Sequence, residues 1–227
     1  MMAKKTFWYK EFNCPVCEQE FEAVRVFSNA VSIDKRDLYL RPTYKGVDPD
    51  KFYLITCPYC YYTAFESDFD NLPGNLSLDK LNSLKKSLER AMKSLNPELG
   101  EERTARDAHE INVLGVLTYV HADIPYKLAQ IFLRMSWFYI DQGDKENAAI
   151  SMSKALKQFQ RAFEDDKKGL HTDGIIFFLA ALNIQLNHIK EGFRWLEKLL
   201  KEYRGTGSHY EKAGKTLWEE VRESKLM

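Results

Sequence analysis

Two copies of one four-residue pattern constrain this chain more than any other feature of its sequence. Cys14-Pro15-Val16-Cys17 and Cys57-Pro58-Tyr59-Cys60 use all four cysteines and are separated by 39 residues. Pairs of this kind are typical of a tetrahedral four-sulfur metal site, because each tight turn directs two thiolates at one ion. The sequence therefore predicts a single site for Zn²⁺, with iron possible, formed by Cys14, Cys17, Cys57 and Cys60.

The composition of this site predicts a structural role for the metal. Four protein ligands leave no position on the ion for a catalytic water. A module of about 60 residues is at the margin of independent stability, whereas a structural zinc ion contributes about 10 kcal/mol or more. Glycine often follows the second cysteine of such turns, where φ is positive. Glu18 and Tyr61 stand there, so we expect strained or differently shaped turns.

Thiol redox chemistry is an alternative use of the same cysteines. Cys57-Pro58-Tyr59-Cys60 equals the active-site tetrapeptide of glutaredoxins and follows a β-rich run. A redox dithiol needs a low-pKa thiolate at the N-terminus of a helix. The surrounding sequence lacks the βαβ context of that fold, and the other Cys-Pro-x-Cys would have no role. A redox protein or redox sensor remains the first alternative.

The charge balance disfavours a dedicated nucleic-acid binder. The chain has 33 basic and 33 acidic side chains, so its formal net charge is zero. A second alternative is nucleic-acid binding by the N-terminal ribbon. The basic and aromatic residues of this ribbon alternate with Asp34, Asp37 and Asp48, so its local positive electrostatic field is weak. These basic and aromatic residues are Arg25, Lys35, Arg36, Tyr39, Arg41, Tyr44 and Lys45.

Apolar segments are too short to predict a membrane span or a signal peptide. The best candidate, residues 174–186, contains Asn183 and Gln185 and falls short of the roughly 18 apolar residues that a spanning helix needs. The charged pair Lys10-Glu11 interrupts the N-terminal segment where a signal peptide would need a long apolar run. We therefore expect a cytoplasmic protein. Its reducing compartment disfavours disulfides.

The chain is predicted to be α+β and mostly α, with a change of character near residue 70. Residues 21–27 alternate apolar and polar side chains, and residues 51–56 form a β-rich run that ends at Cys57. After Pro73-Gly74, apolar residues recur with helical spacing. We expect a zinc-ribbon-like β module at residues 1–70 and a domain of antiparallel helical hairpins at residues 75–227. Its helices are predicted after the cap Ser77 and at about 102–120, 126–141, 145–163, 174–186, 189–203 and from Ser208 onward.

Part of the helical half matches the spacing of a tetratricopeptide repeat. The first match is carried by Phe132, Met135, Ser136, Tyr139, Ala148, Met152 and Ala155, with a turn at residues 142–145. A weaker copy follows at Ala180, Gly192, Leu196 and Leu199, with a turn at Asn187-His188. Stacked hairpins of this kind present a concave binding surface. In this register the predicted partner-binding residues are Gln130, Leu133, Trp137, Asp141, Phe177 and Gln185.

The whole pattern resembles the bacterial domain-of-unknown-function family 2225. The resemblance is carried by Tyr9, both Cys-Pro-x-Cys motifs, the run Asp34-Lys35-Arg36-Asp37, Tyr44, Pro49, Tyr53, Arg134-Met135-Ser136-Trp137 and Gly192-Phe193-Arg194-Trp195. It covers most of the chain and implies zinc binding with a tetratricopeptide-like helical domain, but no reaction.

No sequence pattern for nucleophilic catalysis, phosphate binding or dinucleotide binding is present. The leading hypothesis is therefore a non-enzymatic scaffold or adaptor protein. We expect it to hold a protein or peptide partner on its helical surface, with the metal module as a rigid attachment.

Overall fold

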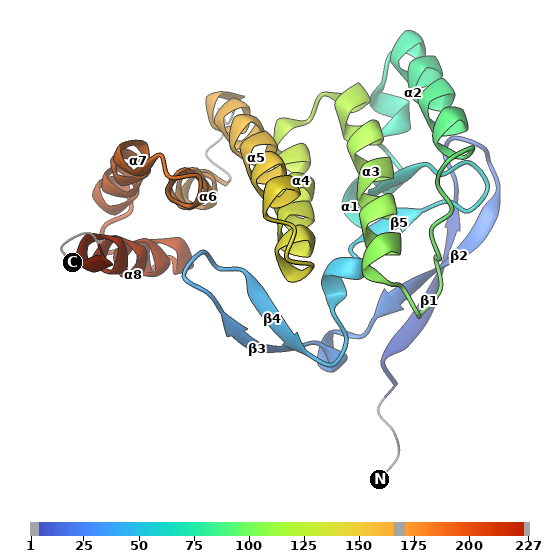
Figure 1. Ribbon diagram of the computed structural model, residues 1–227. Helices are drawn as coiled ribbons and strands as arrows, with labels where there is room; N and C mark the ends of the chain where they lie inside the picture. Colours follow the sequence, from blue (N-terminus) through green and yellow to red (C-terminus); the bar gives the residue numbers. More distant parts are fainter. Residues whose placement is uncertain (1–4, 166–170, 225–227) are drawn as a thin grey trace. The chain divides into compact units, whose positions relative to one another are not determined.

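The protein is α+β and mostly α, as the sequence predicts (Figure 1). A computed structural model describes residues 5–165 and 171–224. The chain forms two compact units, residues 1–34 with 44–124 and residues 35–43 with 125–227. Within the described ranges, every helix is too short or too polar to cross a membrane.

The first unit is built on β-hairpins that carry the cysteines. β1 pairs antiparallel with β2, with Phe7 opposite Val26 and Asn13 opposite Glu20. β5 pairs antiparallel with β6, and a third pair, β3 with β4, lies between them in the sequence. The strands are β1 Phe7–Asn13, β2 Glu20–Val26, β3 Ser32–Arg36, β4 Pro42–Lys45, β5 Leu54–Thr56 and β6 Thr63–Phe65.

Three helices complete the first unit: α1 Glu66–Phe69, α2 Leu78–Ala91 and α3 Ala105–Ala122. Ser77 caps α2 as predicted, because its side chain accepts a hydrogen bond from the N–H of Lys80. Thr104 and Asp107 form a reciprocal capping box at the start of α3. Local hydrogen-bonding chemistry thus sets where both helices begin.

Side-chain contacts attach α3 to the β-hairpin of β5 and β6. The hydroxyl of the buried Tyr119 accepts a hydrogen bond from the N–H of Phe65 at 3.0 Å and donates one to Asp68 at 2.6 Å. Just before α3, Arg103 donates to the carbonyl of Lys51 at 3.0 Å. Burial, with the charge of Arg25, lowers the pKa of Arg103 to about 10. The compact first unit accordingly extends to residue 124, whereas the sequence places α2 and α3 in the helical domain.

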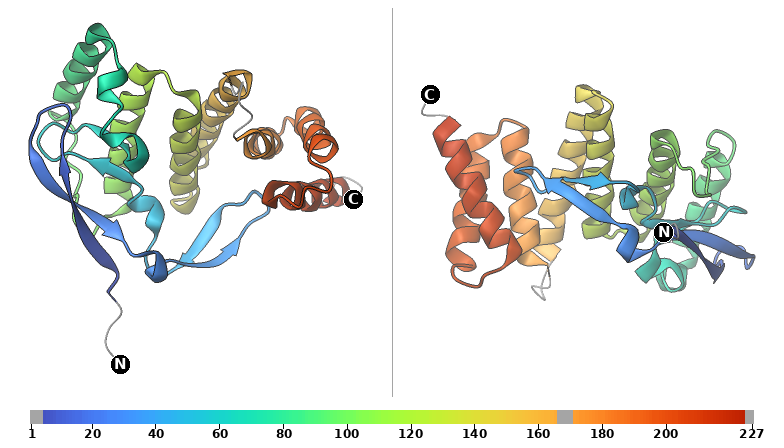
Figure 2. Two further views of the ribbon diagram at one scale, coloured as in Figure 1. Left: turned by 180° about the vertical axis from the view of Figure 1, so that it is seen from behind. Right: turned by 90° about the horizontal axis from the view of Figure 1, so that it is seen from below.

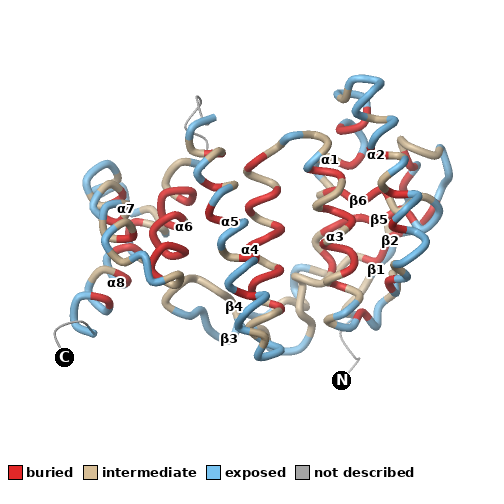
Figure 3. Tube along the Cα trace, turned by 45° about the horizontal axis from the view of Figure 1, so that its top comes forward, coloured by how far each residue is buried: buried red, intermediate tan, exposed pale blue. Residues whose placement is uncertain are grey.

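The second unit consists of α4 Pro125–Asp141, α5 Lys145–Asp165, α6 Thr172–Gln185, α7 Ile189–Glu202 and α8 His209–Ser224. These bounds agree with the predicted ranges to within a few residues. α4 packs on α5, α6 packs on α7, and α8 contacts both α6 and α7, so the last three helices lie side by side (Figure 2). α6 is buried along nearly its whole length (Figure 3), and it forms the centre of the core.

The segment between β3 and β4 packs against this core. Leu38, Tyr39 and Leu40 contact the buried cluster of α6, α7 and α8. The carboxylate of Asp37 fixes the tip, because its Oδ1 accepts hydrogen bonds from the N–H groups of Tyr39 and Arg41 at 2.9 and 2.8 Å. Residues 35–43 are thereby part of the second unit.

The start of α8 is fixed by a polar network around Glu211. Its N–H donates to the hydroxyl of Ser208 at 3.1 Å, which is the predicted helix-capping contact. Its carboxylate accepts hydrogen bonds from the N–H groups of Gly205 and Gly207 at 2.9 and 3.0 Å. Lys215 first, then these backbone groups, lower the pKa of Glu211 to about 2. These contacts of Glu211 fix the first turn of α8.

Candidate metal centre and helical pocket

The four cysteines lie close together and could hold a metal ion. Their sulfur atoms all lie within 4.8 Å of one another. The Sγ atoms of Cys14 and Cys60 are 3.6 Å apart, and those of Cys17 and Cys57 are 3.7 Å apart. Four sulfurs bound at about 2.3 Å around one tetrahedral ion are about 3.8 Å apart. The observed separations therefore fit a four-thiolate site.

Each cysteine pair lies at the turn of a β-hairpin, and the two turns have nearly the same geometry. In the first, the N–H of Glu18 donates to the carbonyl of Cys14 at 2.8 Å; in the second, the N–H of Tyr61 donates to that of Cys57 at 2.9 Å. Glu18 has a φ of 60° and Tyr61 a φ of 61°. Two similar turns thus present two sulfurs each to one point.

Backbone donors and neighbouring thiols give the cluster an uneven electrostatic balance. The thiol of Cys57, followed by Cys60 and the N–H groups of Val16 and Cys17, lowers the pKa of Cys14. Interaction with Cys14 raises the pKa of both Cys57 and Cys60. A bound cation would stabilise the thiolate form of all four cysteines.

An aromatic cluster lies beneath the cysteine turns. Tyr62 and Phe69 are fully buried, and their ring centroids are 4.9 Å apart. Phe12 contacts Phe69 with a centroid separation of 5.3 Å. The hydroxyl of Tyr62 donates to the carbonyl of Phe69 at 3.0 Å. Cys14 and Cys57 are themselves fully buried.

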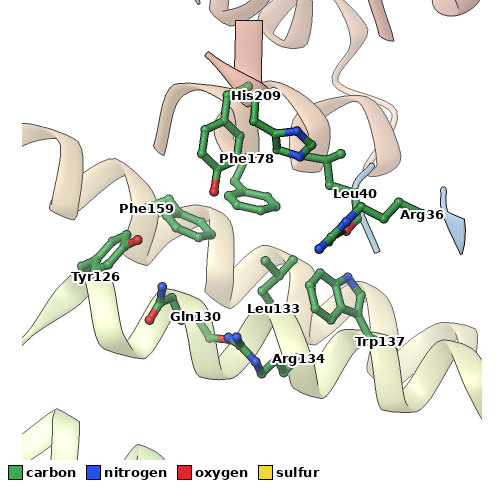
Figure 4. A pocket seen from close by; sticks show the side chains of 11 residues that line it. Arg36, Leu40, Tyr126, Gln130, Leu133, Arg134, Trp137, Phe159, Phe178 and His209 are labelled. Carbon is green, nitrogen blue, oxygen red and sulfur yellow. Dashed lines mark hydrogen bonds between the residues drawn. The ribbon is translucent and has the colours of Figure 1, made fainter. Parts of the chain in front are cut away.

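A pocket of about 220 Å³ lies within the second unit. Its walls come from α4, α5, α6, the start of α8, the end of β3 and the tip between β3 and β4. Figure 4 shows Leu133 and Trp137 of α4 pointing toward Phe178 and His209, with Arg36 reaching in from the end of β3. The lining residues are Arg36, Leu40, Tyr126, Gln130, Leu133, Arg134, Trp137, Phe159, Phe178, His209 and Tyr210.

The structure brings together three of the six predicted partner-binding residues. Gln130, Leu133 and Trp137 line the pocket. Asp141 forms an ion pair with Arg41 and lies outside the lining set. Phe177 is fully buried in the core, and the amide of Gln185 donates to the carbonyl of Ala181 at 3.5 Å.

Sequence reasoning missed most of the other pocket residues. On α6 the lining residue is Phe178, one position after the predicted Phe177. Because this helix is apolar on all sides, the sequence does not show which of the two adjacent phenylalanines faces the pocket. Arg36 and Leu40 come from a segment almost 90 residues before α4, and no local pattern links them to it.

Basic residues of the proposed nucleic-acid ribbon are engaged in the structure. Arg25 pairs with Glu66 at 2.5 Å, Lys45 with Asp34 at 2.8 Å, and Arg41 with Asp141. These contacts reduce the free positive charge that a phosphate backbone would meet.

Comparison with known protein families gives a match that covers almost the whole chain. The profile of a family described as "Uncharacterized protein conserved in bacteria (DUF2225)" matches residues 7–225. The chain belongs to this family. The resemblance based on the cysteine motifs and the helical half is therefore confirmed.

The description of the family names no activity. An uncharacterized protein of Borreliella burgdorferi is 27% identical over 164 residues. The match spans 64% of this chain and 57% of that relative. No solved structure matches the chain.

The positive φ of Glu18 leads to a testable expectation for this DUF2225 chain. A non-glycine residue in the left-handed region costs about 1–2 kcal/mol, and glycine avoids most of this cost. Glu18→Gly is therefore expected to stabilise the metal-loaded protein by about 1 kcal/mol in thermal unfolding. Gln19→Gly, at the adjacent exposed position, is the matched control and should give no gain. Equal stability of the two variants would contradict strain at Glu18.

Proposed function

We propose that this protein is a non-enzymatic interaction protein that holds a segment of a partner protein in the pocket of its second unit. The observation that carries the proposal is the pocket itself. It joins three residues predicted for partner binding with side chains from α5, α6, α8 and the β3–β4 tip. Concave sites with mixed aromatic and polar walls are the usual form of a binding site.

The proposal assigns the helical hairpins to a tetratricopeptide-like arrangement. Support comes from the succession of α4 with α5 and α6 with α7 as packed pairs. Small residues lie where the helices approach: Ser136, Ala148 and Ala155 are almost fully buried in the first pair. Stacked hairpins of this kind form a concave binding surface, and both α4 and α6 contribute residues to the pocket.

The proposal assigns a structural zinc ion to the cysteine cluster. The sulfur spacing and the all-thiolate donor set suit Zn²⁺. A redox role is less well supported, because both cysteine pairs lie in β-hairpin turns. In the part of the chain that the structure describes, neither pair is at the start of a helix, where reactive thiolates are found. We therefore expect the four thiols to be unreactive while metal is bound.

The test of partner binding uses a substitution that fills the pocket. Random dodecapeptides displayed on phage would be selected on the full-length protein, and the affinities of the selected peptides measured by fluorescence polarisation. Gln130→Trp places a large ring among the lining residues and is expected to weaken binding at least about tenfold, because occupied space excludes the peptide.

Gln160→Trp is the matched control, since Gln160 is exposed on α5 and does not line the pocket. It should leave peptide affinity unchanged, and circular dichroism should show both variants folded. If the selected peptides bind Gln130→Trp as tightly as the unaltered protein, the pocket is not the binding site and the proposal fails.

A further inference from the structure

The chemistry of the pocket walls indicates the kind of group that they bind. Among the described lining residues two are arginines, Arg36 and Arg134, and none is acidic. Apart from Gln130 and His209, apolar and aromatic side chains make up the remainder of the wall, chiefly Leu40, Leu133, Trp137 and Phe178. The pocket therefore suits a ligand that has both an anionic and an apolar part.

Arg36 differs from the neighbouring arginines in how its charge is used. Its Nη1 donates to the carbonyl of Leu40 at 3.2 Å, and it has no ion pair among the residues that the structure describes. Arg25 and Arg41 each pair with a carboxylate. The backbone contact orients the guanidinium of Arg36 and leaves its net charge uncompensated.

Arg36 and Arg134 line the same pocket as Tyr210, and Nη1 of Arg134 also donates a hydrogen bond to the carbonyl of Gln130 at 3.3 Å. Burial and the charge of Asp173 raise the pKa of Tyr210, whereas the charges of Arg36 and Arg134 lower it. Tyr210 itself lines the pocket. Asp173 does not line the pocket. An arriving carboxylate would meet two cations.

The size of the pocket selects among possible carboxylates. A cavity of about 150 Å³ holds one benzene molecule, so the 220 Å³ here suits one large side chain with a small polar group. An internal aspartate or glutamate brings a carboxylate but little apolar surface. The last residue of a polypeptide brings both, because its α-carboxylate is attached to the residue that also carries the side chain.

We infer that the pocket binds the C-terminal residue of a partner polypeptide, with a large apolar side chain. The side chain contacts Leu133, Trp137 and Phe178, and the α-carboxylate pairs with Arg36 and Arg134. This inference rests on the proposed function and specifies its ligand. Guanidinium groups favour carboxylates because they donate two parallel hydrogen bonds.

The test compares peptides that differ only at the chain end. Fluorescein-labelled Gly-Ser-Gly-Ser-Gly-Phe would be titrated with the full-length protein as the free acid and as the C-terminal amide. A third peptide, amidated, carries Glu-Phe in its interior. The free acid is expected to bind about tenfold or more tightly than either amide, since only it provides the terminal carboxylate. Equal binding of acid and amide, or no binding of the acid at millimolar concentration, would overturn the inference.

Substitutions of the arginines test the same contact from the protein side. Arg36→Gln and Arg134→Gln are each expected to remove most of the preference for the free acid, and Arg36→Lys should retain part of it. Arg204→Gln is the control, because Arg204 is exposed in the same unit and outside the pocket. An unchanged preference in both folded glutamine variants would also overturn the inference.

The two proposals can fail separately. Suppose that Gln130→Trp weakens the binding of the selected peptides but that these peptides show no preference for a free C-terminus. The inference is then wrong and the proposed function stands. If they are insensitive to Gln130→Trp, the proposed function fails as well.

Discussion

Removal of the metal is expected to unfold the cysteine hairpins of the first unit. Four thiols in contact would then lose the cation that compensates their charge, and a structural zinc ion contributes about 10 kcal/mol or more to folding. Such a loss is comparable to the whole stability of a typical domain. Hydrogen exchange measured by mass spectrometry should show loss of protection in β1, β2, β5 and β6 after treatment with a chelator. All four ligands belong to the first unit, so α6 in the second unit serves as the internal reference.

A pair of neighbouring substitutions separates metal loss from general damage to the turn. Cys60→Ser removes one ligand, whereas Tyr59→Ser changes a side chain that is 55% exposed in the same turn. Only Cys60→Ser should lower the metal content, which is expected to be about one ion per chain by elemental analysis. Protection that persists in protein shown to be metal-free would contradict a structural role for the site.

The metal ligands could be predicted from the sequence because their geometry is almost entirely local. A Cys-x-x-Cys turn places two sulfurs by itself, and the strand before the second pair could be recognised at residues 51–56. What the sequence could not provide was the form of the turn. Glu18 and Tyr61 adopt the positive φ that glycine usually supplies, so the turn keeps its shape despite the unfavourable residue type.

The extent of the first unit was harder to predict because it depends on contacts between distant residues. Helical periodicity located α3 to within a few residues. The periodicity did not show that Tyr119 would bond to Phe65, or that Arg103 would bond to Lys51. A helix of mixed burial looks the same in sequence whether it packs on a sheet or on another helix.

The pocket residues could be predicted from the sequence only in part. Repeat spacing placed Gln130, Leu133 and Trp137 on one face of α4, and a helix keeps such residues together. Arg36 depends instead on where the β3–β4 tip packs, which is set by Leu38, Tyr39 and Leu40 against the helical core. Local sequence patterns therefore could not assign Arg36 to the pocket.

Adding one methyl group at Gly192 is expected to destabilise the second unit by about 2 kcal/mol. A Cβ there would lie 2.5 Å from Cγ1 of Ile184 and 3.2 Å from the carbonyl oxygen of Ala180. The carbonyl belongs to the backbone of α6, so α6 and α7 would have to move apart. Alanine in place of glycine favours a helix by about 1 kcal/mol, but overpacking of this kind costs about 1–3 kcal/mol or more. Urea unfolding of Gly192→Ala, followed by tryptophan fluorescence, measures the balance.

Gly214→Ala is the matched control because it makes the same change in another helix of the same unit. Its Cβ would meet Cδ2 of Leu199 at 2.7 Å, but that atom is the end of a side chain that can rotate away. The helix-forming preference of alanine should then dominate, and Gly214→Ala should be neutral or slightly stabilising. Equal destabilisation by the two variants would mean that the backbone contact at Gly192 does not set the approach of α6 and α7. Loss of stability at Gly192 alone would identify it as the residue that permits this packing, as the repeat spacing of the sequence predicts.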